Sequence, residues 1–157
     1  MRHKKVAKRQ IEGDKIYRSK LLAKFTNVLM KDGKKTIAQK VIYSAFDIIV
    51  KNNLEPLEVF EKALQNVGPK QEVRPRRIGG ASYQVPVEVR GDRRVSLAIR
   101  WIIESARAKS NKDFPTFAEK LASELMDAYN DQGASIKKRD TVLRMAEANR
   151  AFAHFRY

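Results

Sequence analysis

The sequence predicts a mainly α, single-domain protein of about six helices, with one protruding β-hairpin between the third and fourth helices. Three observations lead to this prediction. Most of the chain repeats its apolar residues at helical spacing. One stretch, residues 72–90, instead alternates apolar and polar side chains with the period of two of a half-exposed strand. The length of 157 residues suits one domain with a packed core.

The hairpin is predicted from two extended runs that flank a pair of glycines. The first run covers residues 73–78, and the second alternates strictly over residues 83–90. Gly79 and Gly80 between them indicate a turn of four to five residues. Two strands alone are marginal in water, so we expect the hairpin to lean on helices or on a partner.

Capping and helix-breaking residues delimit the six helices. Their expected starts are Ser19, Thr36, Pro56, Asp92, Thr116 and Ile136, with Ser19 and Asp92 as N-caps and Thr116 in a capping box with Glu119. Ile37 opens the apolar stripe of the second helix. Trp101, in the most apolar helix, is interpreted as a core residue rather than a base-stacking platform. Asn149 interrupts the last stripe, either where the helix leaves the core or as an RNA-facing residue.

The charge of the chain predicts a polyanionic partner. Lys and Arg number 33 against 18 Asp and Glu, a net charge of +15. Residues 1–40 hold 13 basic and 3 acidic residues, and residues 70–112 hold 11 and 4. We expect the fold to gather these basic blocks onto one face. The chain has no cysteine, which excludes disulfides and zinc-finger modules, and no apolar run approaches the roughly 18 residues of a membrane span.

The basic residues fall into four clusters: the tail, a loop, the hairpin with Arg74, Arg76 and Arg77, and a helix start. Residues 1–18 read as a basic flexible tail that orders on a partner, with a solvated terminus as the alternative, and residues 19–157 as the helical domain. Lys34 and Lys35 stand at a helix start, in a loop that fails the phosphate-binding P-loop pattern but suits a phosphate backbone. Lys137, Lys138 and Arg139 crowd another first turn, where the helix dipole disfavours cations, so a nearby anion is the simplest reason for them.

Catalytic and metal-binding chemistry is not predicted. His3 and His154 lie near opposite ends of the chain, with no carboxylate cluster of metal-ligand spacing beside them. Neither a nucleophile elbow nor a dinucleotide fingerprint is present. We therefore expect no enzyme activity, no cofactor and no metal. Basic patches spread over a tail, a loop, a hairpin and a helix start fit folded RNA better than duplex DNA.

Several motifs, taken in order, resemble the bacterial small-subunit ribosomal protein S-seven family over nearly the whole chain. They are Asp32–Lys35, Arg76–Gly80, Tyr83–Pro86, Ala98–Trp101 and Arg144–His154. The resemblance implies direct binding to the 3′ major domain of the small-subunit ribosomal RNA (rRNA), where such a protein starts assembly of the subunit head. It also implies neighbouring proteins S-nine and S-eleven, and a cytoplasmic ribosome, with an organellar ribosome left open.

Site residues follow from the clusters and the resemblance together. The residues expected to bind rRNA are Arg2, Lys4, Lys5, Lys8, Arg9, Lys34, Lys35, Arg74, Arg76, Arg77, Arg93, Arg94, Lys137, Lys138 and Arg139. The resemblance places the hairpin and the last helix near the exit site, where messenger RNA and transfer RNA pass. The residues expected there are Gly79, Gly80, Ser82, Tyr83, Arg144, Asn149 and Arg150.

Two alternatives remain at this level. A stand-alone architectural or regulatory protein could insert the arginine-bearing hairpin into the minor groove of DNA. A small enzyme acting on RNA is the other rival, although the sequence offers it no acid–base pair. The role of Tyr83 is also open, because its ring can pack on its own hairpin or stack on a base.

Overall fold

The computed structural model describes residues 10–155 and confirms the mainly α prediction, with the hairpin between the third and fourth helices. The elements are α1 (Lys20–Leu29), α2 (Lys35–Lys51), α3 (Pro56–Val67), β1 (Gln71–Ile78), β2 (Ala81–Glu88), α4 (Gly91–Ala108), α5 (Phe117–Tyr129), α6 (Ala134–Ala148) and the 3-10 helix η1 (Arg150–Phe155). No helix within residues 10–155 combines the length and apolarity needed to cross a bilayer.

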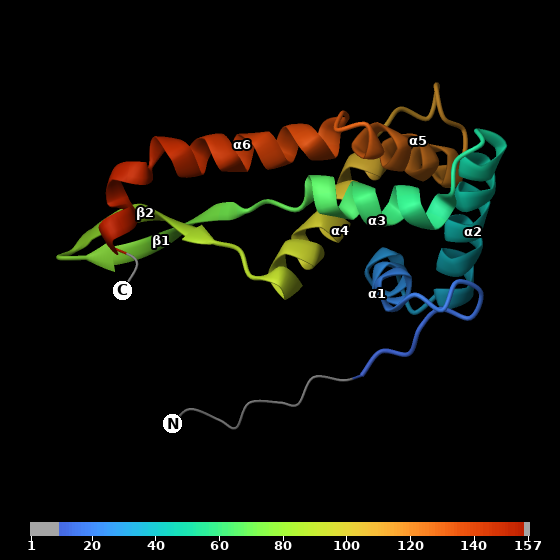
Figure 1. The fold of residues 1–157 in the computed structure, drawn as a ribbon, viewed down its shortest axis with the longest axis horizontal. Helices are drawn as coiled ribbons and strands as arrows, with labels where there is room; N and C mark the ends of the chain where they lie inside the picture. The colour runs from blue at the N-terminus through green and yellow to red at the C-terminus, as the bar shows by residue number, and fades with distance from the viewer. Residues whose placement is uncertain (1–9, 156–157) are drawn as a thin grey trace.

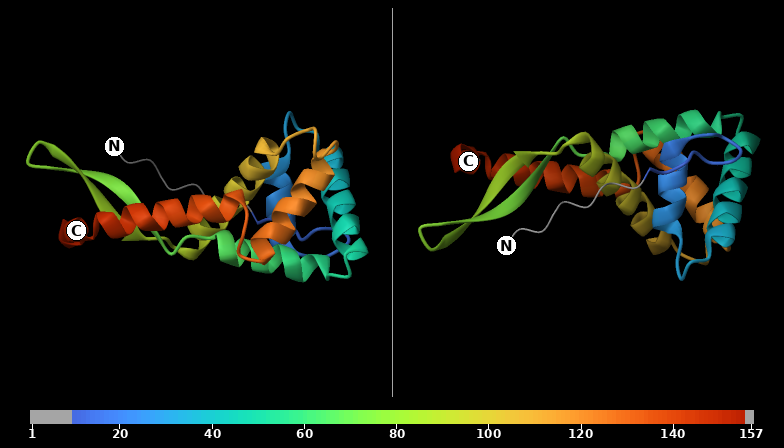
Figure 2. Two further views of the ribbon diagram at one scale, coloured as in Figure 1. Left: turned by 90° about the horizontal axis from the view of Figure 1, so that it is seen from above. Right: turned by 90° about the horizontal axis from the view of Figure 1, so that it is seen from below.

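The molecule consists of a helical bundle and a long arm. Helices α1 to α5 form the bundle, and the hairpin extends from it to the opposite end of the long axis (Figure 1). Helix α6 leaves the bundle in the same direction and packs along β1, and η1 turns back onto β2 (Figure 2). The expectation that the hairpin leans on a helix is therefore confirmed.

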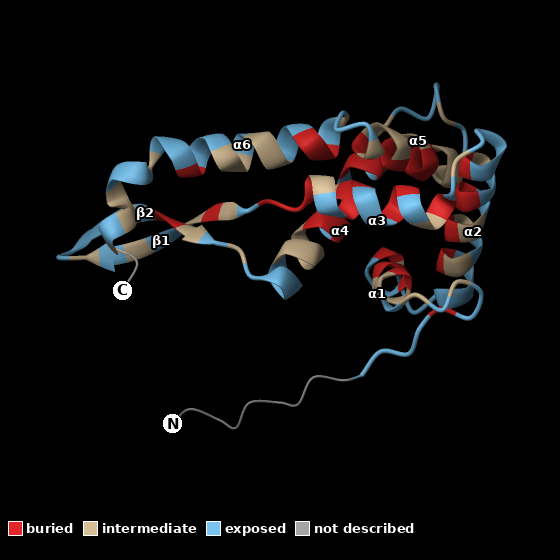
Figure 3. Cartoon of the chain, viewed as in Figure 1, coloured by how far each residue is buried: buried red, intermediate tan, exposed pale blue. Residues whose placement is uncertain are grey.

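The core of the bundle is centred on three phenylalanines from three helices. Phe25, Phe46 and Phe60 are each at most 1% exposed. The rings of Phe25 and Phe60 meet edge to face with centroids 5.3 Å apart, the arrangement that aromatic quadrupoles favour. Buried residues concentrate in the bundle, whereas the outer arm is mostly exposed or half-buried (Figure 3). The bundle thus provides the stability that the arm cannot supply alone.

Three predicted helix starts are confirmed and one is wrong. The Oγ of Ser19 accepts a hydrogen bond from the Leu22 amide, and Thr116 forms the predicted capping box with Glu119. Pro56 occupies the first turn of α3. Asp92, however, is not the cap of α4, which begins at Gly91. The carbonyl of Arg90 already accepts the Arg94 amide at 2.9 Å, so Arg90 is the cap and Asp92 lies in the first turn.

The hairpin turn is tighter than predicted. Ile78 pairs with Ala81, so the turn contains two residues and not four to five. Gly79 and Gly80 both adopt positive φ, 55° and 92°, which lets the chain reverse in two residues while matching the twist of the strands. Val85 is fully buried, but Pro86, predicted on the opposite side of the strand, is buried too, beside Leu143 and Ala146 of α6, so the predicted alternation fails at this pair.

The N-terminal segment docks on the bundle before the predicted boundary at residue 18. Asp14 is buried and its carboxylate accepts a hydrogen bond from the Tyr43 hydroxyl at 2.9 Å. Burial and this hydrogen bond raise the pKa of Tyr43 to about 12. Tyr17 packs edge to face on Phe46, with centroids 5.3 Å apart. The tail predicted over 1–18 therefore includes two packed residues, Asp14 and Tyr17, and the part at 1–9 lies outside the described residues.

The last helix is divided at Asn149. Helix α6 ends at Ala148, and the Asn149 side-chain amide donates to the Met145 carbonyl at 2.8 Å as the C-cap. The predicted apolar stripe does not continue as one α-helix through Phe152, because the chain follows as the 3-10 helix η1. Of the two interpretations of Asn149, the structure supports a helix end, because its backbone N–H and its side-chain amide both donate to the Met145 carbonyl in the last turn of α6.

Trp101 is half-buried at the edge of the core, where it lines a shallow groove beside Lys137 and Lys138. We expect Trp101→Ala to lower the free energy of unfolding by about 2 kcal/mol, less than for a fully buried ring, because part of the ring is already exposed. Urea unfolding of the free protein measures this loss. Unchanged stability combined with weaker RNA binding would instead make the ring a stacking platform.

Candidate nucleic-acid interface

The loop between α1 and α2 presents two cations to solvent. Asp32 and Gly33 adopt positive φ, 53° and 73°, and direct the chain into α2 with Lys34 as N-cap and Lys35 as first residue. Both lysines are exposed, and neither has an ion-pair partner among residues 10–155. No acidic residue occupies the first turn of α2. Both lysines are therefore free to meet an external phosphate, and their binding to RNA stays a prediction.

The base of the arm holds two predicted RNA-binding arginines on one buried carboxylate. Glu72 is 7% exposed, and its Oε1 accepts from Arg74 Nε at 2.6 Å and from Arg93 Nε at 2.8 Å. Burial alone would raise the pKa of Glu72, but the hydrogen bonds from Arg93 and Arg74 outweigh it and the pKa falls below its ordinary value. Together the two arginines and Glu72 carry one net positive charge in a fixed geometry. Sequence reasoning missed Glu72, because its partner Arg93 lies 21 residues away.

Nearer the tip, two arginines lack such a partner. Arg76 lies opposite Tyr83 and Arg77 opposite Ser82 in the hairpin. Arg77 is exposed and Arg76 half-buried, and neither forms an ion pair within the part of the chain that the structure describes. Guanidinium groups can donate to phosphates or base edges, and binding of Arg76 and Arg77 to RNA stays a prediction.

Arg94 and Arg139 each bind backbone carbonyls of the protein. Arg94 donates to the carbonyls of Gly68 at 2.9 Å and Gln65 at 3.0 Å. Arg139 donates to the carbonyl of Asn66 at 3.0 Å and pairs with Asp131 and Asp140 at 2.7 Å. These carbonyls end α3, where a helix leaves acceptors unsatisfied. Binding of these two arginines to RNA stays a prediction, but the geometry gives each a protein acceptor.

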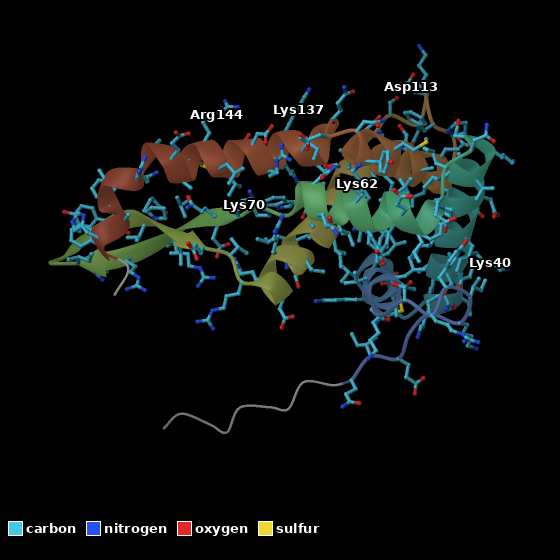
Figure 4. The ribbon with its side chains drawn as sticks, viewed as in Figure 1. Lys40, Lys62, Lys70, Asp113, Lys137 and Arg144 are labelled. Carbon is cyan, nitrogen blue, oxygen red and sulfur yellow. The ribbon has the colours of Figure 1, made fainter. Side chains whose placement is uncertain are left out.

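The anion expected near the start of α6 comes from the protein itself. Glu124 of α5 is fully buried, and its Oε1 accepts from the amide and the hydroxyl of Ser135, at 2.9 and 2.7 Å. Lys138 pairs with Glu104 at 2.6 Å. For Lys138 and Arg139 the nearby anion is thus an acid of the protein, and binding of either residue to RNA stays a prediction. Lys137 has no such partner among the described residues, and with Arg144 it projects from the outer side of α6 (Figure 4).

Tyr83 packs in a way that neither sequence interpretation anticipated. Its ring lies on Phe152 and Phe155 of η1, with centroids 5.3 and 5.4 Å apart. This aromatic cluster attaches the C-terminal 3-10 helix to β2. The predicted exit-site residues from the hairpin and from the end of α6 are thereby brought to one part of the molecule.

The predicted basic residues that the structure describes lie in two regions along the long axis, and their gathering on one face stays a prediction. One region is the loop with Lys34 and Lys35 at the bundle end, and the other is the arm with α6 (Figure 1). Arg2, Lys4, Lys5, Lys8 and Arg9 lie outside the described residues. The residues that are described contain no cluster of three or more His, Cys, Asp or Glu side chains suited to a metal.

A helical bundle that carries unpaired surface cations and an arginine-bearing arm defines a protein of the polyanion-binding class. The sequence comparisons specify the family. The model of ribosomal protein S7p/S5e matches residues 1–150, and the chain belongs to this family. The predicted resemblance is thus confirmed.

Full-length relatives agree with the family. Small ribosomal subunit protein uS7 of Thermotoga neapolitana is 58% identical over 158 residues and covers 100% of both chains. The uS7 of Caldicellulosiruptor bescii is 58% identical over 153 residues, 97% of this chain and 96% of its own. That of Desulfatibacillum aliphaticivorans is 52% identical over 157 residues, 99% of each. This membership confirms the expectations of a structural role in the small ribosomal subunit and of no catalysis.

Proposed function

We propose that this protein binds the 3′ major domain of the small-subunit rRNA directly, nucleates assembly of the subunit head, and extends its arm toward messenger RNA and exit-site transfer RNA. The observation that carries the proposal is the separation of its unpaired cations into a loop on the bundle and an arm at the far end of the long axis (Figure 1). Two regions so far apart can serve two RNAs. Proteins S-nine and S-eleven, as neighbours, belong to the same proposal on the resemblance alone.

In this proposal the bundle anchors the protein to the rRNA through the loop cations Lys34 and Lys35. The loop cations stand on a rigid scaffold, because α2 contributes Phe46 and Ile49 to the buried core. Cations on a rigid element bind phosphates with less loss of conformational entropy than cations on a mobile chain. Phosphate contacts also position a protein on RNA without reading its sequence.

Replacing Lys34 and Lys35 together by Gln is expected to weaken rRNA binding and flatten its salt dependence. Each lost phosphate contact lowers the slope of log affinity against log salt by about 0.7–0.9, so the double variant loses up to about 1.8. Filter binding of a 3′ major domain fragment over a series of KCl concentrations measures the slope. Lys51→Gln, at the other end of α2, is the matched control. An unchanged slope in the double variant would place both lysines in plain solvent.

The arm tip is suited to contact rather than to support. A Cβ added at Gly79 or Gly80 would meet nothing within 4 Å, so the described protein leaves the space around the tip open. The packed part of the arm lies closer to the bundle, where Val85 is buried and Tyr83 meets η1. The tip can therefore be shortened without disturbing the packing that holds the arm.

The register of the hairpin allows a sharp test of the proposed division. Deleting Arg77, Ile78, Ala81 and Ser82 removes two cross-strand pairs, keeps the Gly79–Gly80 turn, and leaves Arg76 opposite Tyr83. Because two residues leave each strand, every remaining side chain keeps its face. We expect normal incorporation of the shortened protein into small subunits, with altered reading-frame maintenance or altered retention of exit-site transfer RNA.

Arg77→Gln, which removes charge without length, is the control for this deletion. Failure of the shortened protein to enter subunits would make the arm an anchor. Normal assembly with unaltered decoding would remove the role proposed for the tip.

A further inference from the structure

An apolar groove of about 330 Å³ lies beside the loop cations on the bundle. Its apolar lining comes from the end of α1, the start of α2 and the start of α5, and includes Met30, Ile37, Val41 and Phe117. Ile37, predicted for a buried stripe, is 57% exposed. The volume is at the lower end of the roughly 300–1,000 Å³ of pockets that bind small ligands.

The charge of the rim is of one sign. Lys31, Lys34 and Arg107 line the groove, and no acidic residue does so among those described. Arg107 is held in place, because its Nη2 donates to the Leu29 carbonyl at 3.3 Å. An apolar hollow with a cationic rim is complementary to a ligand that has a flat apolar part next to negative charge. The basic segment at residues 1–9 would be repelled from it.

We propose that this groove binds one unstacked nucleobase of the rRNA, with the flanking phosphates on Lys31, Lys34 and Arg107. The inference rests on the proposed function and names what the bundle-end site binds. A nucleobase offers a π-face to Phe117 and Ile37, and unstacked bases are the parts of folded RNA that proteins read most readily. Lys34 lines the groove and adjoins Lys35, so one continuous strand can occupy both the groove and the loop.

Two exposed apolar residues of the same helix provide the test. Ile37 and Val50 lie near opposite ends of α2 and are 57% and 53% exposed, but Val50 lies outside the groove. Gln is a good helix former, so neither Ile37→Gln nor Val50→Gln should disturb folding. We expect Ile37→Gln to weaken binding of the 3′ major domain fragment about five- to tenfold. The salt slope should stay unchanged, since an apolar contact releases no counterions. Val50→Gln should bind like the wild type.

A photoreactive benzoylphenylalanine at position 37 then identifies the occupant in assembled subunits. The expected product is a cross-link to a single unpaired rRNA nucleotide, mapped by arrest of reverse transcription, with no such product from position 50. A cross-link to a neighbouring protein would overturn the inference and make the groove a peptide site. Equal affinities of the two Gln variants would also overturn it, while leaving the proposed function intact. Failure of the wild-type protein to bind the 3′ major domain fragment would overturn the proposed function and this inference together.

Discussion

Glu124→Ala is expected to lower the free energy of unfolding by about 3–5 kcal/mol, because it breaks a buried charge pair and removes the cap of a neighbouring helix. Glu124 is 0% exposed, and its Oε2 lies 3.3 Å from the Lys109 ammonium. Its Oε1 accepts both hydrogen bonds from Ser135 in the first turn of α6. The substitution leaves those donors buried without an acceptor, and each such donor costs about 1–3 kcal/mol. Urea unfolding followed by circular dichroism measures the loss.

Matched variants separate the cap from the charge. Glu124→Gln keeps a carbonyl oxygen for Ser135, and Lys109 keeps its partner Asp127 at 2.7 Å, so we expect a loss smaller than that of the Ala variant. Glu147→Ala, on the exposed face of α6, should change stability by less than about 0.5 kcal/mol. A Glu124→Ala protein as stable as Glu147→Ala would show that α6 does not depend on the cap. Amide exchange in the first turn of α6 should quicken in the Ala variant.

Phe60→Ala is expected to lower the free energy of unfolding by about 3–5 kcal/mol through the loss of a central ring. Phe60 is 0% exposed and contacts two further aromatic rings, Phe25 with centroids 5.3 Å apart and Phe46 at 6.0 Å. Removing it leaves a cavity between helices from distant parts of the sequence, which the close-packed core can only partly fill. Thermal unfolding of the free protein measures the effect.

Phe60→Leu is the control for this substitution, since it retains most of the apolar volume. We expect it to cost less than about 1.5 kcal/mol. RNA affinity measured at a temperature where each variant is folded should be unchanged for both, because Phe60 is fully buried and cannot itself contact RNA. Weaker binding by folded Phe60→Leu would mean that the core also shapes the RNA-binding surface.

Features that depend on a few neighbouring residues could be predicted from the sequence. The cap at Ser19, the capping box of Thr116 with Glu119, and Pro56 at the start of α3 are local, and each was predicted at the correct position. The alternation that predicted the hairpin strands likewise depends only on neighbouring residues. Even here the predicted length of the turn was wrong, because Gly79 and Gly80 indicate a chain reversal without specifying which residues pair across it.

The chemical nature of the interface was also readable from the sequence, because charge is a property of composition. The excess of basic residues, 33 against 18 acidic ones, indicated a polyanionic partner, and the motifs in their order indicated the family. The sequence did not show which cations remain free of protein partners and so available to RNA. Arg94 and Arg139 bind carbonyls at the end of α3 and at its C-cap, 26 to 73 residues distant, and Lys138 pairs with Glu104 from 34 residues away.

The sequence by itself therefore determined the helices, the arm and the need for a polyanionic partner, since these follow from local periodicity and net charge. Only the tertiary structure decided that Glu124 caps α6, that Glu72 holds two arginines, and that Tyr83 joins the arm to η1. The physical reason is that a hydrogen bond or ring contact between distant residues depends on how helices pack. A pattern of apolar spacing indicates which face a helix buries, but not which residue of another helix meets it there.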